Sequence, residues 1–250
     1  MKEEFEFVFD SFENEDIKKF AEDCVNKAPD YWHHVAASST GKYHPSYALG
    51  EAGLVRHTIA VIRFLNHMFG VESIANQFSS RERDLLRVAA LSHDMMKSGT
   101  QEEFERNKYT KHEHPVLAAN MIKSMSGLNK EELDFIAHAI ESHMGQWNTA
   151  RNSKVVLPKP QDKYQIILHL ADYLASRKDI EVLFSSNNDK ISNNEKPVDL
   201  NAWKIDFGKY SGKTLKEVAE IDKGYLEWAS GNIKKEPAAS YIKKYLNLIK

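Results

Sequence analysis

The adjacent pair His93-Asp94, within the largely apolar stretch of residues 88–97, constrains this chain more than any other feature. At about 100° per residue, Leu86 and His93 fall near one face of a helix, so the imidazole is expected to enter the interior. Burying a lone carboxylate next to it is costly, and a divalent cation shared by both side chains is one arrangement that removes this cost. Lys97 follows one turn after His93 and could present a positive charge to an approaching anion.

The bulk composition is that of a globular protein. With 250 residues, of which 42% are hydrophobic and 28% charged, the chain can bury one good core and form a small accessory unit. No apolar run approaches the roughly 20 residues of a membrane span, and the N-terminus lacks a basic region followed by an apolar one. We therefore expect a cytoplasmic protein without a membrane partner. Cys24 is the only cysteine, which excludes an internal disulfide and a thiolate metal cluster.

The apolar spacing predicts an all-α protein. Helices are expected over residues 16–27, 51–69, 82–97, 116–125, 129–142 and 162–177. Residues 1–14, in which phenylalanines alternate with acidic residues, are interpreted as a short strand or as an arm packed on the body. The long segment before residue 51 is rich in Ser, Gly, Pro, aromatics and His, which favours a binding surface over a plain connector.

The C-terminal part differs in composition from the body. Residues 184–200 are polar, poor in apolar residues and typical of a linker. Residues 201–250 are expected to form a turn or hairpin and two short helices, a small module that is α or α+β. Residues 203–250 carry ten lysines and six acidic residues, a net charge of +4, which leaves −6 for the rest because the total is −2. This basic charge is a mild indication of a polyanionic partner.

Several helices point a histidine or an aspartate inward. His57 shares a face with core residues, Pro115 places His114 near a helix start, and His143 projects with the apolar side of its helix, whereas His138 does not. The inward or loop-placed set is His57, His93, Asp94, His114, His143 and Asp172. Four imidazoles and two carboxylates suit one or two borderline divalent ions, and Asp94 is best placed to bridge two of them. Two bridged ions would hold a shared water as hydroxide and neutralise a phosphate, which is hydrolytic phosphoester chemistry.

Plainer interpretations accompany each candidate. The six-residue set could be a structural network of buried histidines paired with carboxylates, and Lys97 could be a solvated charge at a helix end. Candidate substrate-binding residues, each of which could equally serve the loop surface or pair with an acid, are Lys42, Tyr43, His44, Arg56 and Arg177, in addition to Lys97. His169 is interpreted as a residue that supports or packs against the ligands rather than as a ligand.

Taken in order, these motifs resemble the HD superfamily of metal-dependent phosphohydrolases. The resemblance covers roughly residues 30–180 and is carried by GLVRHT (53–58), SHDMMK (92–97), HEHP (112–115), SHMG (142–145) and LADY (170–173). It implies an all-helical HD domain over residues 1–183. It also implies a first metal held by His57, His93, Asp94 and Asp172, and a second completed by His114 and His143. The lysine matching Lys97 is implied to contact phosphate or to assist the leaving group.

Two further similarities narrow the expected substrate. The segment AASSTGKYHP (36–45) before GLVRHT is similar to the HD branch that contains a bacterial 3′-to-5′ exoribonuclease, although this chain lacks that enzyme's N-terminal nucleic-acid domain. FGKYSGKTL (207–215) with GYLEW (224–228) is similar to a small module appended to some DNA exonucleases and found in phage proteins. These similarities imply a nucleic-acid connection and a bacterial cell or a phage-infected host.

The sequence therefore predicts a phosphohydrolase that cleaves a phosphate ester of a nucleotide or nucleic acid, with Asp94 and Lys97 as catalytic residues. Its cofactors would be divalent ions, two in the full pattern, chosen among Mn, Fe, Ni, Co, Mg and Zn. Its partner would be a nucleotide or a single-stranded nucleic acid, and a homo-oligomer is compatible with the composition. The alternative is an HD scaffold that senses a nucleotide or binds nucleic acid without turnover.

Overall fold

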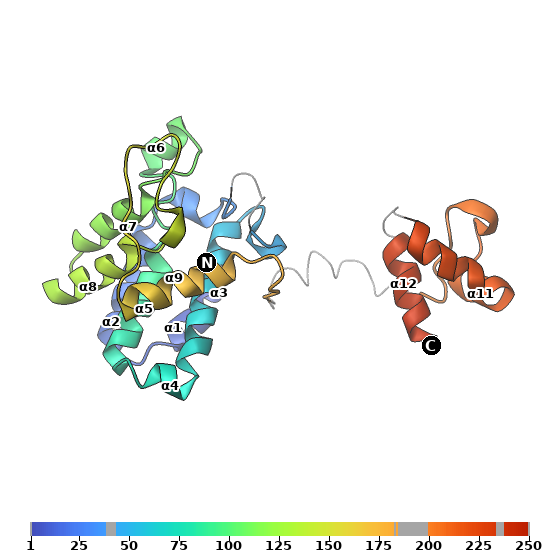
Figure 1. Ribbon diagram of the computed structural model, residues 1–250, viewed down its shortest axis with the longest axis horizontal. Coiled ribbons are helices and arrows are strands. Elements are labelled where there is room, and N and C mark those ends of the chain that lie inside the picture. Colours follow the sequence, from blue (N-terminus) through green and yellow to red (C-terminus); the bar gives the residue numbers. More distant parts are fainter. Residues whose placement is uncertain (1, 39–43, 183, 185–199, 234–237, 250) are drawn as a thin grey trace. The chain divides into compact units, whose positions relative to one another are not determined.

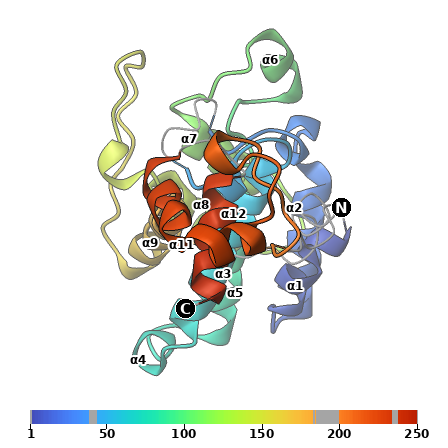
Figure 2. The same cartoon turned by 90° about the vertical axis from the view of Figure 1, so that its right-hand side faces the viewer.

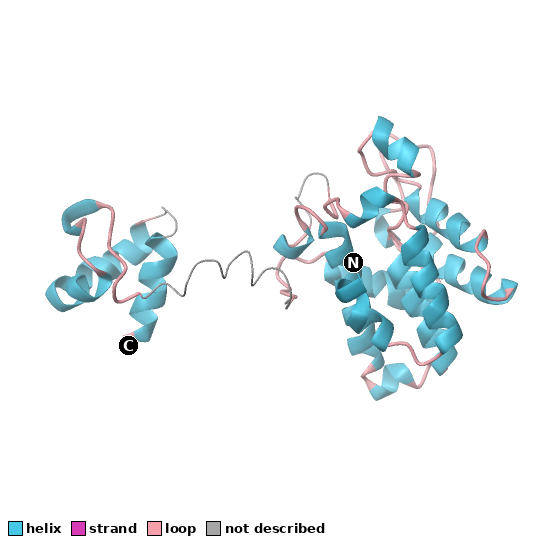
Figure 3. Ribbon diagram, turned by 180° about the vertical axis from the view of Figure 1, so that it is seen from behind, coloured by secondary structure: helices cyan, strands magenta, loops and turns pink. Residues whose placement is uncertain are grey.

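The structure is a computed structural model that describes residues 2–38, 44–182, 184, 200–233 and 238–249. Over these residues the regular elements are helices, as Figure 3 shows. In addition, Lys204 and Thr214 form one isolated antiparallel β-bridge. The prediction of an all-α protein is thus confirmed. Among the described residues no helix is long and apolar enough to cross a membrane.

The chain divides into two compact units, residues 1–183 (unit 1) and residues 184–250 (unit 2). The elements of unit 1, in which η denotes a short 3₁₀ helix, are α1 (Lys2–Asp10), α2 (Glu15–Lys27), η1 (Asp30–His33), η2 (Ser46–Ala48), α3 (Gly53–Phe69), α4 (Glu72–Ala75), α5 (Ser80–Ser92), α6 (Gln101–Arg106), α7 (His114–Lys123), α8 (Lys130–Glu141), η3 (Gly145–Trp147) and α9 (Lys163–Ala175). The six predicted helices are found as α2, α3, α5, α7, α8 and α9. Most of the predicted linker, residues 185–199, lies outside the described residues.

Helix α5 forms the centre of unit 1. Each residue from 84 to 92 is buried, and α5 packs against α2, α3, α8 and α9. The small helices α4 and α6 lie at opposite ends of the unit (Figures 1 and 2). A helix that is buried on all sides delivers whatever follows its last turn into the interior, and here the residues that follow are His93 and Asp94.

The N-terminal segment contains the helix α1, so the strand expected over residues 1–14 was wrong, whereas the alternative of an arm packed on the body agrees with the buried Phe5 and Val8. Phenylalanine at alternate positions suggested a period of two, but Phe7 is 37% exposed, whereas Phe5 and Val8, three residues apart, are buried. Phe5 also stacks on Trp32, with ring centroids 5.7 Å apart. The helical period therefore buries α1 on the segment that precedes α3.

A buried ion pair that the sequence reasoning missed joins the α1–α2 corner to α5. Asp84, with 0% exposure, accepts hydrogen bonds from the backbone N–H groups of Glu13 (2.9 Å) and Asn14 (2.7 Å). It also pairs with Arg87, whose Nε donates to Asn66 on α3. A buried carboxylate with this many donors fixes the packing of three helices.

Removing this carboxylate is expected to be costly. Asp84→Ala leaves the buried Arg87 and two backbone N–H groups without this acceptor, so the free energy of unfolding should fall by about 3–5 kcal/mol in a urea titration. The exposed Asp134 on α8 provides the control, because Asp134→Ala should change it by no more than about 0.5 kcal/mol. Equal effects of the two substitutions would contradict a structural role for the Asp84 network.

Unit 2 has a small core of its own. Its elements are η4 (Gly208–Tyr210), α11 (Leu215–Asn232) and α12 (Ala238–Leu248). Leu215, Val218, Leu226 and Ile242 are fully buried in this core. Tyr210 lies in this core and Tyr225 packs against it. Trp228, by contrast, is 54% exposed.

Candidate metal centre

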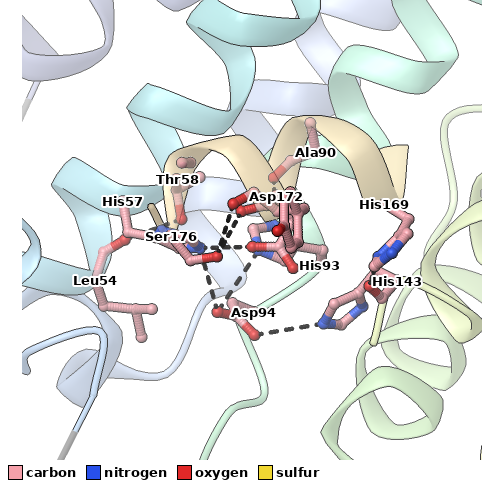
Figure 4. A network of polar contacts seen from close by, with 12 residues as sticks. Leu54, His57, Thr58, Ala90, His93, Asp94, His143, His169, Asp172 and Ser176 are labelled. Atoms are coloured by element: carbon pink, nitrogen blue, oxygen red, sulfur yellow. Dashed lines mark hydrogen bonds and ion pairs between the residues drawn. The ribbon is translucent and has the colours of Figure 1, made fainter. Parts of the chain in front are cut away.

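The structure brings the six predicted ligand residues together, although they come from five separate parts of unit 1. In one half of the centre, Asp172 Oδ1 on α9 lies 3.0 Å from His57 Nε2 on α3 and 3.8 Å from His93 Nε2. The Oδ2 atom of Asp94 lies 3.9 Å from His57 Nε2 and 3.6 Å from His93 Nε2 (Figure 4). Two carboxylates and two imidazoles thus converge on one volume.

The other half of the centre is formed around the second carboxylate oxygen of Asp94, Oδ1. Asp94 Oδ1 is 3.0 Å from His114 Nε2 and 3.7 Å from His143 Nε2. The two Nε2 atoms of His114 and His143 are themselves only 3.1 Å apart. The clusters that could hold an ion are His57, His93 and Asp94; His93, His143 and Asp172; and Asp94, His114 and His143. Asp94 contributes one carboxylate oxygen to each half, and the cluster of His93, His143 and Asp172 also spans the two halves.

Hydrogen bonds to the main chain orient three of the imidazoles. His93 Nδ1 donates to the carbonyl of Ala90 (2.7 Å), and His143 Nδ1 donates to that of Ile140 (2.9 Å). His114 Nδ1 likewise donates to the carbonyl of Lys111 (2.6 Å), and in each case the acceptor lies three residues earlier. Because a carbonyl can only accept, Nδ1 carries a proton in all three rings, and Nε2 is the ring nitrogen that faces the centre.

Nearby charges lower the pKa values of both carboxylates, and burial lowers those of two histidines, His93 and His143. Burial by itself raises the pKa of Asp94, but Lys97, whose Nζ is 2.5 Å from Oδ2, and His93 lower it, and the net pKa is well below the usual value. The pKa of Asp172 is also lowered, because its hydrogen bond to His57 and the charges nearby outweigh burial. Burial lowers the pKa of His143 to about 3.

The segment after His143 depends on a glycine. Gly145 has a φ of +56°, and a Cβ there would lie 2.1 Å from Cε1 of the His169 ring. Because Gly145 has no side chain, the His169 ring can occupy this space, and its Nδ1 donates to the carbonyl of His143, 2.7 Å away. His169 therefore supports the backbone of a candidate ligand and is not itself among the clustered donors, as the sequence reasoning expected.

A tyrosine that the sequence reasoning did not single out holds the turn after His93-Asp94. This turn begins at Ser92, so α5 ends earlier than the predicted residue 97. The Tyr31 hydroxyl accepts from the backbone N–H of Ser98 (3.0 Å) and donates to the carbonyl of Gly99 (2.8 Å). A tyrosine in a long irregular segment gives no periodic signal that could have identified it.

The predicted substrate-binding residues lie in different surroundings. His44 packs edge-on against His57, with ring centroids 5.1 Å apart, and burial lowers its pKa to about 3. Lys42 and Tyr43 lie outside the described residues. Arg56 donates to the carbonyls of Tyr47 and Leu49, so two of its donors stabilise the chain before α3.

Lys97 and Arg177 are the remaining candidate substrate-binding residues, and His138 is the histidine that was predicted to lie away from the centre. The Lys97 side chain is 13% exposed and paired with Asp94, so it is not a solvated charge at a helix end. Arg177 lies with its Cζ atom 4.3 Å above the Tyr173 ring. His138, expected away from the centre, has a side chain that is 52% exposed and pairs with Asp162 at 2.6 Å.

Comparison with protein families matches residues 64–177 to the HD domain and residues 205–234 to the exodeoxyribonuclease X-like C-terminal family. The HD match includes five of the six clustered residues, whereas His57 lies before its first residue. Searches of curated proteins and of solved structures found no significant match. The predicted assignment to the HD superfamily, with a C-terminal module like that of an exonuclease, is thereby confirmed.

The turn held by Tyr31 gives a testable prediction. Tyr31→Phe leaves a buried N–H and a buried carbonyl without a partner, so the free energy of unfolding should fall by about 1–3 kcal/mol. Hydrogen exchange of the Ser98 amide should accelerate at the same time. Tyr109 is 72% exposed, and Tyr109→Phe should leave both measurements unchanged. An unaltered Ser98 exchange rate in Tyr31→Phe would refute the assigned role.

The lowered pKa of His143 predicts how stability depends on pH. In chelator-treated protein, unfolded histidines take up protons near about pH 6.5, whereas folded His143 stays neutral until about pH 3. Stability should therefore be greatest above about pH 6.5 and fall by about 1.4 kcal/mol per pH unit below it for each such histidine. His143→Asn should flatten the dependence of the urea midpoint on pH, whereas His67→Asn, on the exposed side of α3, should not.

Proposed function

Because this chain carries an HD domain followed by an exodeoxyribonuclease X-like C-terminal segment, we propose that it is a metal-dependent phosphohydrolase. Its substrate would be a phosphate ester of a nucleotide or nucleic acid. Two divalent cations would bind in the centre described above, one on each side of Asp94. The proposal rests on the donor atoms of unit 1, and the family matches supply the class of chemistry.

The single observation that carries the proposal is the approach of His114 Nε2 to His143 Nε2 at 3.1 Å. Both rings donate their Nδ1 protons to carbonyls, so both Nε2 atoms face the carboxylate of Asp94, and His114 Nε2 lies 3.0 Å from its Oδ1. Two imidazole nitrogens and a carboxylate oxygen this close together are the donor types that borderline divalent cations bind. The residues present therefore fit a divalent ion.

The donor set also indicates which cations would bind. Nitrogen and carboxylate oxygen without thiolate suit Mn, Fe, Co, Ni and Zn, whereas Mg prefers oxygen ligands alone. His57, His93, Asp94 and Asp172 would hold one cation, and Asp94, His114 and His143 would hold the other. When bound, the cations would supply Lewis-acid activation of water and charge neutralisation at the phosphate.

The chain's own residues contribute orientation and charge. Main-chain carbonyls fix the three imidazoles, so little reorganisation is needed when a ligand enters. Lys97 neutralises Asp94 in the form described here. Once cations satisfy Asp94, the ammonium group can turn to a phosphate oxygen or a leaving group, as the catalytic role predicted for Lys97 requires. Asp172, with a side chain that is 19% exposed, marks the side of the centre that solvent reaches.

The proposal predicts that metal content and turnover are lost together. Asp94→Ala and His143→Ala should each lower kcat/KM by about 10³-fold or more, since metal activation is worth several kcal/mol. Metal analysis should show a matching loss of bound ion. His67→Ala, on the exposed side of α3, is the control and should retain both.

The assay is a hydrolysis screen of manganese-loaded protein against nucleotides and labelled single-stranded RNA and DNA. Hydrolysis that persists in metal-free Asp94→Ala would overturn the proposal. Bound metal and bound nucleotide without product release would instead favour the alternative, an HD scaffold that senses its ligand. Absence of metal from the unmodified protein after loading would favour the third interpretation, in which the buried histidines and carboxylates only stabilise the fold.

A further inference from the structure

A partly exposed aromatic cluster adjoins the candidate metal centre, and neither the family matches nor the proposed catalysis assigns it a role. We propose that Trp147, Tyr173 and Arg177 form a platform on which a nucleobase of the substrate stacks. This inference rests on the proposed function and narrows its substrate class to phosphate esters that carry a base. The three residues are called the aromatic platform below.

The geometry of the platform suits stacking. The rings of Trp147 and Tyr173 are nearly parallel, with an interplanar angle of 16° and centroids 6.0 Å apart. The Cζ atom of Arg177 lies 4.3 Å from the Tyr173 centroid and 5.9 Å from that of Trp147. Because the two rings and the guanidinium pack on one another, the exposed part of Trp147 is held as an aromatic surface next to a positive charge.

The platform adjoins the ligands through the chain itself. Tyr173 directly follows Asp172 on α9, and Trp147 comes four residues after His143. His169 links the two parts, since it bonds the His143 carbonyl and its ring lies 6.5 Å from Trp147 and 6.4 Å from Tyr173. A substrate whose phosphate reached the centre would therefore bring its adjoining base to this cluster.

Exposure distinguishes Trp147 from a core residue. Its side chain is 45% exposed, whereas Trp32 in the core of unit 1 is 0% exposed. A tryptophan face left in water gains free energy when a flat apolar ring covers it. Within unit 1, Tyr173 stacks on Trp147 and part of the Trp147 surface stays open to solvent.

The chemistry of the platform sets what it can recognise. Ring faces carry no hydrogen-bond donors that read a base edge, so the platform accepts any base and discriminates against substrates without one. Arg177 is anchored by Nε to the Tyr173 carbonyl (3.2 Å) and by Nη2 to Ser176 Oγ (3.4 Å). Its remaining donors can meet a phosphate, which suits the substrate-binding role predicted for Arg177 from the sequence.

The test compares two single-stranded DNA oligonucleotides of equal length and charge, one of thymidines and one with abasic sites throughout. Binding to the manganese-loaded, full-length protein is measured by fluorescence anisotropy of an end label. Trp147→Ala should weaken binding of the thymidine strand about tenfold or more, as loss of base stacking does, and that of the abasic strand less than about twofold. Trp147→Phe, which keeps a ring, should retain most of the affinity.

Trp228→Ala is the matched control, because this tryptophan is also exposed but belongs to unit 2. Equal weakening of both strands by Trp147→Ala, or no weakening of either, would overturn the platform, as would a base-dependent loss in Trp228→Ala alone. Hydrolysis of the thymidine strand by the unmodified protein is followed in parallel. Base-dependent binding at Trp147 without hydrolysis would refute the proposed catalysis and leave the platform standing.

Discussion

The carboxylate of Asp94 is the group on which the rest of the structure depends. It is 2% exposed, and its two oxygens face two different sets of donors. Oδ2 meets His57, His93 and Lys97, while Oδ1 meets His114 and His143. A charge buried this deeply is stable only if opposite charge surrounds it, so the helices that carry these donors must pack around the end of α5. The packing of the helices of unit 1 and the compensation of the Asp94 charge therefore depend on each other.

The placement of the candidate ligands at helix ends has a physical reason. Carbonyls in the last turn of a helix lack an intrahelical partner, and those of Ala90 on α5 and Ile140 on α8 are of this kind. A histidine three residues beyond such a carbonyl can donate Nδ1 to it, as His93 and His143 do. The same contact satisfies the helix end and points Nε2 away from it. One hydrogen bond therefore both satisfies the helix end and orients a candidate ligand.

Much of this arrangement could be predicted from the sequence, and the exceptions are instructive. Helical periodicity separated inward His57 and His143 from outward His138, and the exposure of His138 confirms the distinction. The α1 helix was missed because alternate phenylalanines imitate a strand, and only packing shows that one of them is exposed. Trp147 and Tyr31 lie in the 3₁₀ helices η3 and η1, which are too short for a sequence period to relate a residue to a face. Which loop residues reach the centre is decided by tertiary contacts alone.

The hydrogen bonds from the imidazoles to main-chain carbonyls bear on how such proteins diverge. A carbonyl is present whatever amino acid occupies its position, so replacement of Ala90, Lys111 or Ile140 leaves the acceptor in place. Homologous chains could thus differ at these three positions, within the limits set by the packing of buried Ala90 and Ile140, and still orient their histidines alike. Insertions, deletions or prolines in these turns would shift the acceptors, and selection should act against them there more strongly than against most point changes.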